Sequence, residues 1–233
     1  MKKTLFLSLV AASLLAGANL YATPSTQIWN PSTDIQPLRT FHAGVDNYFS
    51  VANNEEATKR YALGTDMGLE YGVVKNLEIG FDAVEPSADP VYFNVKYGLP
   101  ESGYLPAFAA GVFNAGTKKD STDYNIFYGV AAKTFDPVGR ISLGYYSGND
   151  KLLVDEKGDK ANTGLIGSWD KQLTKKIWAS VDYASGNSSY GSFSFGGSYS
   201  LADNVSMIIG YVIFNNTSLN PNNTLTTQFD INF

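Results

Sequence analysis

Apolar and polar residues alternate along most of the chain beyond residue 40, a pattern typical of β-strands whose two faces meet different surroundings. The C-terminal segment shows it clearly, with Leu225, Phe229 and Phe233 on one face and Gln228 and Asp230 on the other. The same period of two recurs in segments of similar length along the chain. It predicts twelve strands, near residues 40–50, 60–74, 77–84, 91–99, 105–115, 123–134, 139–148, 162–172, 176–185, 190–201, 204–214 and 224–233.

The predicted connections alternate in length. Short ones fall at Val74–Asn76, Pro100–Tyr104, Phe135–Val138, Leu173–Lys175 and Ala202–Asp203. Longer polar ones fall near 51–59, 85–90, 116–122, 149–161, 186–189 and 215–223. An even number of strands leaves both ends of the chain on the side of the short turns, which is the layout of an up-and-down transmembrane barrel. We therefore predict an all-β, antiparallel barrel of twelve strands, with ten or fourteen as alternatives.

The N-terminus has the features of a secretory signal peptide, with Lys2 and Lys3 followed by an apolar run from Leu5 to Leu15 and then small residues. That run is too short to cross a bilayer as a helix, which takes about 20 residues. Cleavage after Ala18 or after Ala22 fits the small residues, and we favour Ala22 because it leaves a polar mature end. The predicted organisation is thus a signal peptide at 1–22, a periplasmic N-terminal segment at 23–39 and a transmembrane barrel at 40–233.

The segment before the first strand contains a small tandem repeat, Pro24–Asn30 followed by Pro31–Pro37. Its prolines disfavour the interior of a sheet. It can serve as a tether between the cleavage site and the first strand, or it can fold into the lumen as a plug. We favour the tether.

Composition narrows the class of protein. The chain has 44% apolar and 17% charged residues, and 14% of its residues are aromatic. Without cysteine it has no disulfide, thiolate metal site or thiol nucleophile. A net charge of −5 argues against nucleic acid as a partner, because phosphate binding needs a clustered basic surface. A secreted β-sandwich also alternates, but its strands are shorter and its solvated faces are not rich in Gly and Ser.

With a Sec-type signal, alternating strands and a C-terminal Phe233, the chain resembles Gram-negative outer-membrane β-barrel proteins over essentially all of its mature length. The resemblance implies an outer-membrane location, with membrane lipid and lipopolysaccharide as surroundings. It also implies that the barrel-assembly machinery reads the last strand, and Phe229, Ile231 and Phe233 match that signal.

If the apolar faces meet lipid, the opposite faces line the lumen. The acidic residues projected inward are Asp46, Asp66, Glu70, Glu78, Asp82, Asp170, Asp182 and Asp230. The basic ones are Lys96, Lys133 and Arg140. A tube lined by one sign of charge concentrates counter-ions, so this pattern predicts a porin-like channel for passive diffusion of small polar solutes or cations. Inward Gly64, Gly68, Gly72, Ser194 and Ser198 favour an open lumen.

The alternative is a structural or adhesive barrel whose lumen is closed and whose external loops bind a ligand. A lipid-modifying enzyme is a third class, but the chain has a single histidine, His42, and no serine nucleophile near it in the sequence. Acids in the loop at 149–162 are interleaved with lysines and do not match a calcium loop. The sequence therefore predicts no catalytic residues, metal or cofactor, and it leaves the oligomeric state open.

Overall fold

The computed structural model describes residues 25–51 and 63–233, so the predicted signal peptide and most of the first long connection lie outside the described part. The described residues form twelve strands. They are β1 (Phe41–Val51), β2 (Thr65–Val74), β3 (Leu77–Glu85), β4 (Val91–Leu99), β5 (Ala107–Gly116), β6 (Asp123–Phe135), β7 (Gly139–Ser147), β8 (Thr163–Gln172), β9 (Ile177–Ala184), β10 (Ser192–Ala202), β11 (Val205–Phe214) and β12 (Asn223–Asn232).

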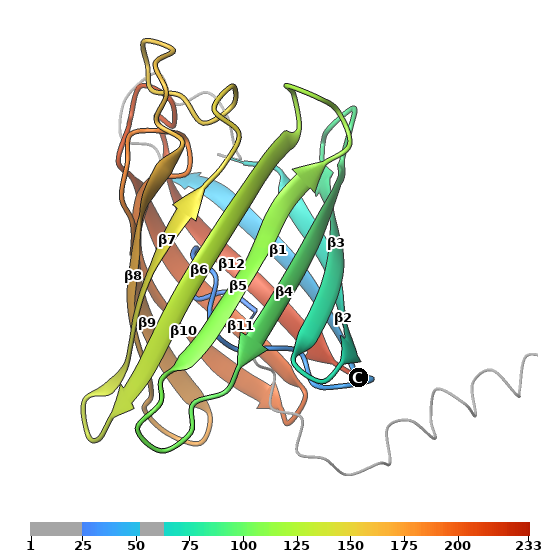
Figure 1. The fold of residues 1–233 in the computed structure, drawn as a ribbon, viewed down its shortest axis with the longest axis vertical. Helices are drawn as coiled ribbons and strands as arrows, with labels where there is room; N and C mark the ends of the chain where they lie inside the picture. Colours follow the sequence, from blue (N-terminus) through green and yellow to red (C-terminus); the bar gives the residue numbers. More distant parts are fainter. Residues whose placement is uncertain (1–24, 52–62) are drawn as a thin grey trace, which may run out of the picture.

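Each strand pairs antiparallel with its neighbours in sequence, and β1 pairs with β12 to close the barrel (Figure 1). At this seam Phe41 and Phe233 exchange two backbone hydrogen bonds, of 2.7 and 2.9 Å. Closure leaves no edge strand with unpaired backbone groups. The predicted all-β, twelve-stranded, up-and-down barrel is confirmed.

The connections fall into two groups at opposite ends of the barrel. The end that carries the C-terminus has the turns 75–76, 136–138, 173–176 and 203–204, whereas the opposite end has longer connections such as 148–162 (Figure 1). The strict alternation of lengths that the sequence predicts has one exception. The connection 100–106, on the C-terminal side, is longer than 86–90 on the other side.

The outer face of the barrel is apolar. Side chains such as Phe81, Leu143 and Ile209 point away from the lumen and are at least 45% exposed. At the β1–β12 seam, the ring of Phe41 lies 4.5 Å from that of Tyr71 and 5.6 Å from that of Phe233. So large an exposed apolar surface is typical of a protein that contacts lipid. No helix in residues 25–51 and 63–233 is long and apolar enough to cross a membrane.

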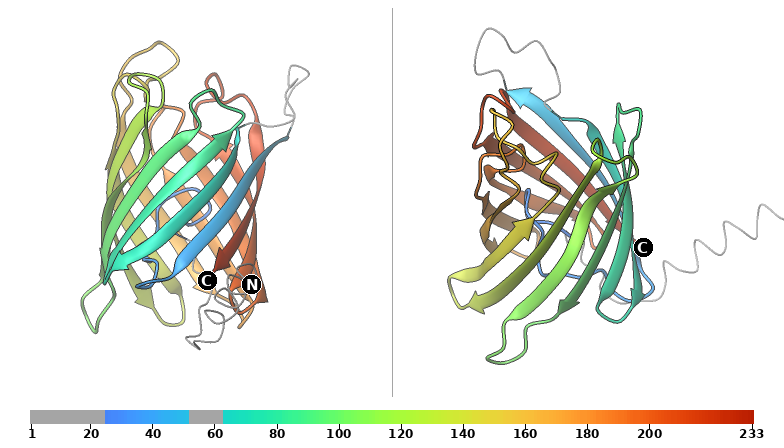
Figure 2. Two further views of the ribbon diagram at one scale, coloured as in Figure 1. Left: turned by 90° about the vertical axis from the view of Figure 1, so that its right-hand side faces the viewer. Right: turned by 45° about the horizontal axis from the view of Figure 1, so that its top comes forward.

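Residues 25–38 lie inside the ring of strands, as the blue segment in Figure 1 and in the left view of Figure 2 shows. We call this segment the N-terminal insert. It enters from the C-terminal end of the barrel, where Arg39 N–H donates to the carbonyl of Gly72 at 2.7 Å. The tether that the sequence favours is therefore not what these residues form, because their polar groups are hydrogen-bonded to the barrel wall.

Candidate functional site

One attachment point of the N-terminal insert is a carboxylate on β9. Asp182 accepts hydrogen bonds from the backbone N–H groups of Ile28 at 2.7 Å and Trp29 at 3.1 Å. It also accepts from the Asn30 amide at 2.9 Å and from the Ser194 hydroxyl at 2.5 Å. Asp182 is 1% exposed, so its charge is stabilised by these four donors in place of water.

A second attachment uses β7 and β8. Asp170 accepts from the Gln27 amide at 3.1 Å and from Arg140 Nε at 2.9 Å. The same arginine holds Asp34 of the insert through two hydrogen bonds of 2.7 Å each. Such a bidentate pair fixes orientation as well as position. Arg140 therefore links the wall to the insert and carries no free charge into the lumen.

The two isoleucines of the tandem repeat pack where the wall has glycine. A Cβ added at Gly210 would lie 2.6 Å from Cγ2 of Ile28, and one added at Gly98 would lie 2.6 Å from Cγ1 of Ile35. Ile28 is 1% exposed and packs with the inward apolar side chains Ile208, Val212 and Phe214. The inward glycines therefore accommodate the insert at these positions and do not simply leave open space.

One side of the interior is an apolar cluster. Its buried members come from β5 to β9 and the connections beyond them, namely Ala109, Ile126, Tyr128, Val130, Tyr146, Leu153, Ile166, Ala184 and Tyr190. The insert joins this cluster through Trp29, whose indole N–H donates to the carbonyl of Tyr190 at 3.0 Å. The interior is consequently divided into an apolar side and a polar side.

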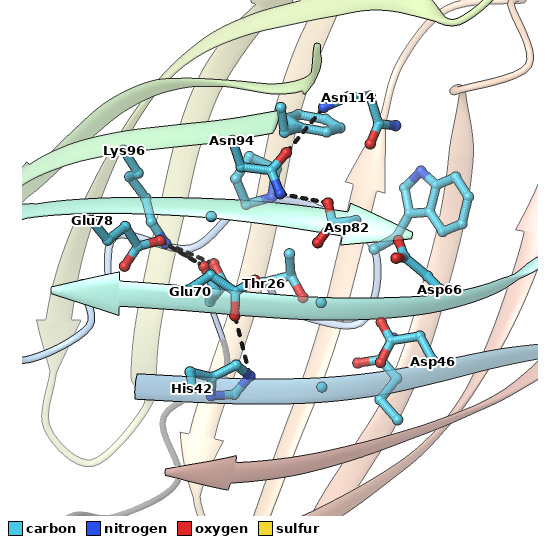
Figure 3. A pocket seen from close by; sticks show the side chains of 18 of the residues that line it. Thr26, His42, Asp46, Asp66, Glu70, Glu78, Asp82, Asn94, Lys96 and Asn114 are labelled. Atoms are coloured by element: carbon cyan, nitrogen blue, oxygen red, sulfur yellow. Dashed lines mark hydrogen bonds and ion pairs between the residues drawn. The ribbon is translucent and has the colours of Figure 1, made fainter. Parts of the chain in front are cut away.

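The polar side contains a cavity of about 190 Å³ between the insert and strands β1 to β4 and β12 (Figure 3). Six of the predicted acids line it, namely Asp46, Asp66, Glu70, Glu78, Asp82 and Asp230. We call these six residues the acid wall. Lys96 and His42 are the basic side chains among the cavity-lining residues.

Part of the acid wall is paired. Lys96 Nζ lies 2.9 Å from Glu78 Oε1, and both side chains also hydrogen-bond the Ser25 hydroxyl at 2.8 Å. His42 Nε2 lies 3.3 Å from Asp230 Oδ1, and its Nδ1 lies 2.9 Å from Asn232 Oδ1. His42 Nε2 also lies 4.0 Å from Glu70 Oε2, so among the described cavity-lining acids Asp46, Asp66 and Asp82 are the ones without an ion pair.

The unpaired carboxylates lie together. Asp46 and Asp66 are directly opposite each other in the β1–β2 register, an arrangement of like charges that destabilises a sheet unless something compensates it. Asp66 Oδ1 and Glu70 Oε2 are buried and have no hydrogen-bond donor in the described residues. Asp82 accepts only the Asn94 amide, at 2.5 Å, among the hydrogen bonds of Figure 3. The ionisable lining of the cavity is therefore predominantly carboxylic.

The structure sorts the eleven predicted lumen residues into three groups. Seven line the cavity: Asp46, Asp66, Glu70, Glu78, Asp82, Lys96 and Asp230. Asp170, Asp182 and Arg140 attach the insert. Of the seven that line the cavity, Glu78 and Lys96 also hold the insert, through Ser25 and, for Glu78, the Gln36 N–H. Lys133 does not point inward. It is paired with outward Ile141 and follows inward Ala132, and its Nζ donates to the carbonyl of Gly103 at 2.6 Å in the turn 100–106.

The error at Lys133 has a physical cause, because β6 carries apolar residues on both of its faces and so has no clear alternation. Sequence reasoning also missed Asp34 and Trp29, which lie in the insert. The signal that could have identified them is the tandem repeat, whose two isoleucines match glycines spaced along the inward faces.

Comparison with known proteins identifies the architecture. No family model matches the sequence, and neither does any curated protein. Among solved structures, the NanC porin superposes with a TM-score of 0.51 over 82% of this chain and 98% of its own, at 9% identity. The KdgM porin superposes with a TM-score of 0.51 over 83% of this chain and 98% of its own, at 12% identity. The chain has the fold of a porin-like outer-membrane β-barrel. At these identities the likeness establishes the fold alone.

Proposed function

We propose that this barrel is an outer-membrane channel for passive diffusion of small polar solutes, with a preference for cations. The observation that carries the proposal is the cavity bounded by the acid wall inside a closed barrel. A narrow passage lined by one sign of charge attracts counter-ions and repels co-ions. The NanC and KdgM porins, two proteins of similar fold, are named as porins, which supports a channel.

The solute path in this proposal runs between the N-terminal insert and the acid wall. The opposite side of the lumen is occupied by the apolar cluster and by Trp29. The insert therefore narrows the passage and brings solutes close to the unpaired carboxylates Asp46, Asp66 and Asp82. A twelve-stranded barrel lies between small barrels with filled interiors and wide porins, so such narrowing has a large effect on conductance.

The location follows from the same proposal. The exposed apolar side chains of the strands would meet membrane lipid, and the longer loops would face lipopolysaccharide. Phe229 and Phe233, 38% and 49% exposed on the outer face of the terminal strand, with Ile231 between them, would be read by the assembly machinery during insertion. Export by a signal peptide within residues 1–22 remains part of this proposal.

A second candidate is a structural or adhesive barrel with a closed lumen. The insert itself favours it, since Asp182, Asp170 and Arg140 fix a segment across the interior. In that case the external loops, including 148–162 and 215–222, would carry the function.

An enzyme fits the geometry less well. His42, the histidine that a lipid-modifying enzyme would need, lies inside the barrel beside Asp230, Glu70 and Asn232. Its described partners are acids and an amide, with no serine in a position to act as a nucleophile. This arrangement supports a positioning role for His42 in the acid wall.

Single-channel recording in planar bilayers separates the two candidates. The refolded protein is added to a lipid bilayer, and its folding is checked by circular dichroism. Stable conductance steps are the expected result. Silence from folded protein would overturn the channel and favour the closed barrel, whose phenotype would then depend on the loops 148–162 and 215–222.

A further inference from the structure

The cavity has two chemically different sides. Besides the acid wall, the cavity is lined by aromatic side chains from the insert, the strands and one connection, namely Trp29, Tyr48, Phe113, Tyr128 and Tyr190. They form one contiguous surface, because the Trp29 ring lies 5.8 Å from Tyr48 and 6.1 Å from Tyr190, and Phe113 lies 5.7 Å from Tyr190. Carboxylates opposite aromatic rings are the two groups that proteins use to hold organic cations.

The carboxylates are free to accept a ligand. Asp66 Oδ1 and Glu70 Oε2 are buried oxygens that accept no hydrogen bond from the described residues. Lys96 is held by Glu78 and Ser25, and His42 Nε2 lies 4.0 Å from Glu70 Oε2, beyond hydrogen-bond distance. Buried carboxylate oxygens without donors are costly, so a donor supplied by a ligand would be favoured here.

We propose that this cavity binds a small organic cation, an aliphatic amine or diamine. Its ammonium group would donate to Asp66 and its neighbours in the acid wall, while its methylene groups would pack against Trp29 and Tyr128. The size is suitable, because an apolar cavity of about 150 Å³ holds a molecule as large as benzene and this cavity is about 190 Å³. In residues 25–51 and 63–233, no three His, Asp or Glu side chains are arranged to hold a metal ion, which favours an organic over a metal cation.

This inference deepens the proposed function by naming the class of solute that is retained in the lumen. Binding itself does not depend on conduction, so it can be measured on the refolded protein in detergent. Isothermal titration calorimetry with 1,4-diaminobutane is the test, and 1,4-butanediol, which has the same chain length without charge, is the control ligand. Saturable binding of the diamine and no binding of the diol are expected.

Substitutions locate the site. Asp66→Asn should weaken diamine binding by about tenfold, the effect of losing one hydrogen bond to a charged group. Asp46→Asn, on the neighbouring strand β1, should weaken diamine binding as well. It replaces Asp66→Asn as the test variant if Asp66→Asn does not fold. Asp203→Asn removes the same charge from an exposed turn and should leave the affinity unchanged.

Three results would overturn the inference: no saturable diamine binding to folded wild-type protein, equal binding of the diol, or unchanged affinity in both Asp66→Asn and Asp46→Asn. A barrel that conducts without binding the diamine would overturn this inference alone. A barrel that binds the diamine without conducting would support the site and overturn the proposed channel.

Discussion

Asp182 accepts the backbone N–H of Ile28 at 2.7 Å, although the two residues are 154 positions apart in the chain. The inward acids are of two kinds, those that bind the N-terminal insert, as Asp182 does, and those that do not. Asp182 and Asp170 are satisfied by donors from the N-terminal insert and the wall, and so act as attachment points. Asp46 and Asp66 are on the side of the lumen that the insert leaves open, and they lack a cationic partner.

Replacing the attachment point should release the insert. Asp182→Ala removes the acceptor shared by Ile28, Trp29 and Asn30. We expect the free energy of unfolding to fall by at least about 3 kcal/mol, because several hydrogen bonds to a charged group are lost and each contributes about 1.5–3 kcal/mol. Single-channel conductance should rise, since the passage widens. Asp203→Ala in the exposed turn is the control, and an unchanged conductance in folded Asp182→Ala would contradict the role of the insert.

The contact between Gly210 and Ile28 gives a steric test. Gly210→Val should displace Ile28, which lies 2.6 Å from the position of the new Cβ, and should lower stability by about 1–3 kcal/mol as overpacking does. The matched control is Gly129→Val, where no atom lies within 4 Å of the added Cβ. Adding Ile28→Ala to Gly210→Val should restore stability, measured by urea unfolding. An additive double variant would show that the two residues are not coupled.

The absence of cysteine allows the insert to be locked in place. The 2.6 Å between the Gly210 Cβ position and Ile28 Cγ2 puts the two Cβ positions within about 4 Å of each other, which suits a disulfide. In an Ile28→Cys, Gly210→Cys variant, oxidation should give a lower and steadier conductance than the reduced form. Each single-cysteine variant should show no response to oxidant. Equal conductance of the oxidised and reduced double variant would mean that the insert does not move during conduction.

The turn 100–106 offers a test that depends on pH. Hydrogen bonds from Lys133 and Thr134 lower the pKa of Glu101 below its ordinary value of 4.5. A lowered pKa in the folded state stabilises the protein above the unfolded-state pKa, and this contribution is lost as the pH falls through the folded-state pKa. Glu101→Gln should therefore lower the thermal midpoint slightly at neutral pH and make no difference at acidic pH. The effect should be small, because the pair is at the surface. A difference that is constant with pH would contradict this assignment.

The strands could be predicted from the sequence because each barrel strand separates two environments, and lipid and lumen impose opposite polarity on successive residues. The acid wall followed from the same rule, since Glu70 and Asp82 alternate with outward Leu69 and Phe81. This alternation of polarity is absent from β6, where the inward residues Tyr128 and Val130 are apolar like the outward residue Phe127. The predicted inward position of Lys133 is wrong for that reason.

The insert could not be predicted by the same reasoning. Its position depends on hydrogen bonds from Asp182 and Arg140, which are distant in sequence, and no local pattern encodes them. Its prolines correctly exclude it from the sheet but do not distinguish a tether from a plug. The local sign of these contacts is the isoleucine at the equivalent position of each repeat, since Ile28 packs against Gly210 and Ile35 packs against Gly98.

The most direct test of the account is the reversal potential of the channel under a salt gradient. Wild-type protein is compared with a triple variant, Asp46→Asn, Asp66→Asn and Asp82→Asn. The control is Asp203→Asn, which removes one carboxylate from an exposed turn outside the cavity. We predict a cation-selective reversal potential for wild type and for the control, and a value close to zero for the triple variant. An unchanged selectivity in the folded triple variant would contradict the claim that the acid wall selects the solute.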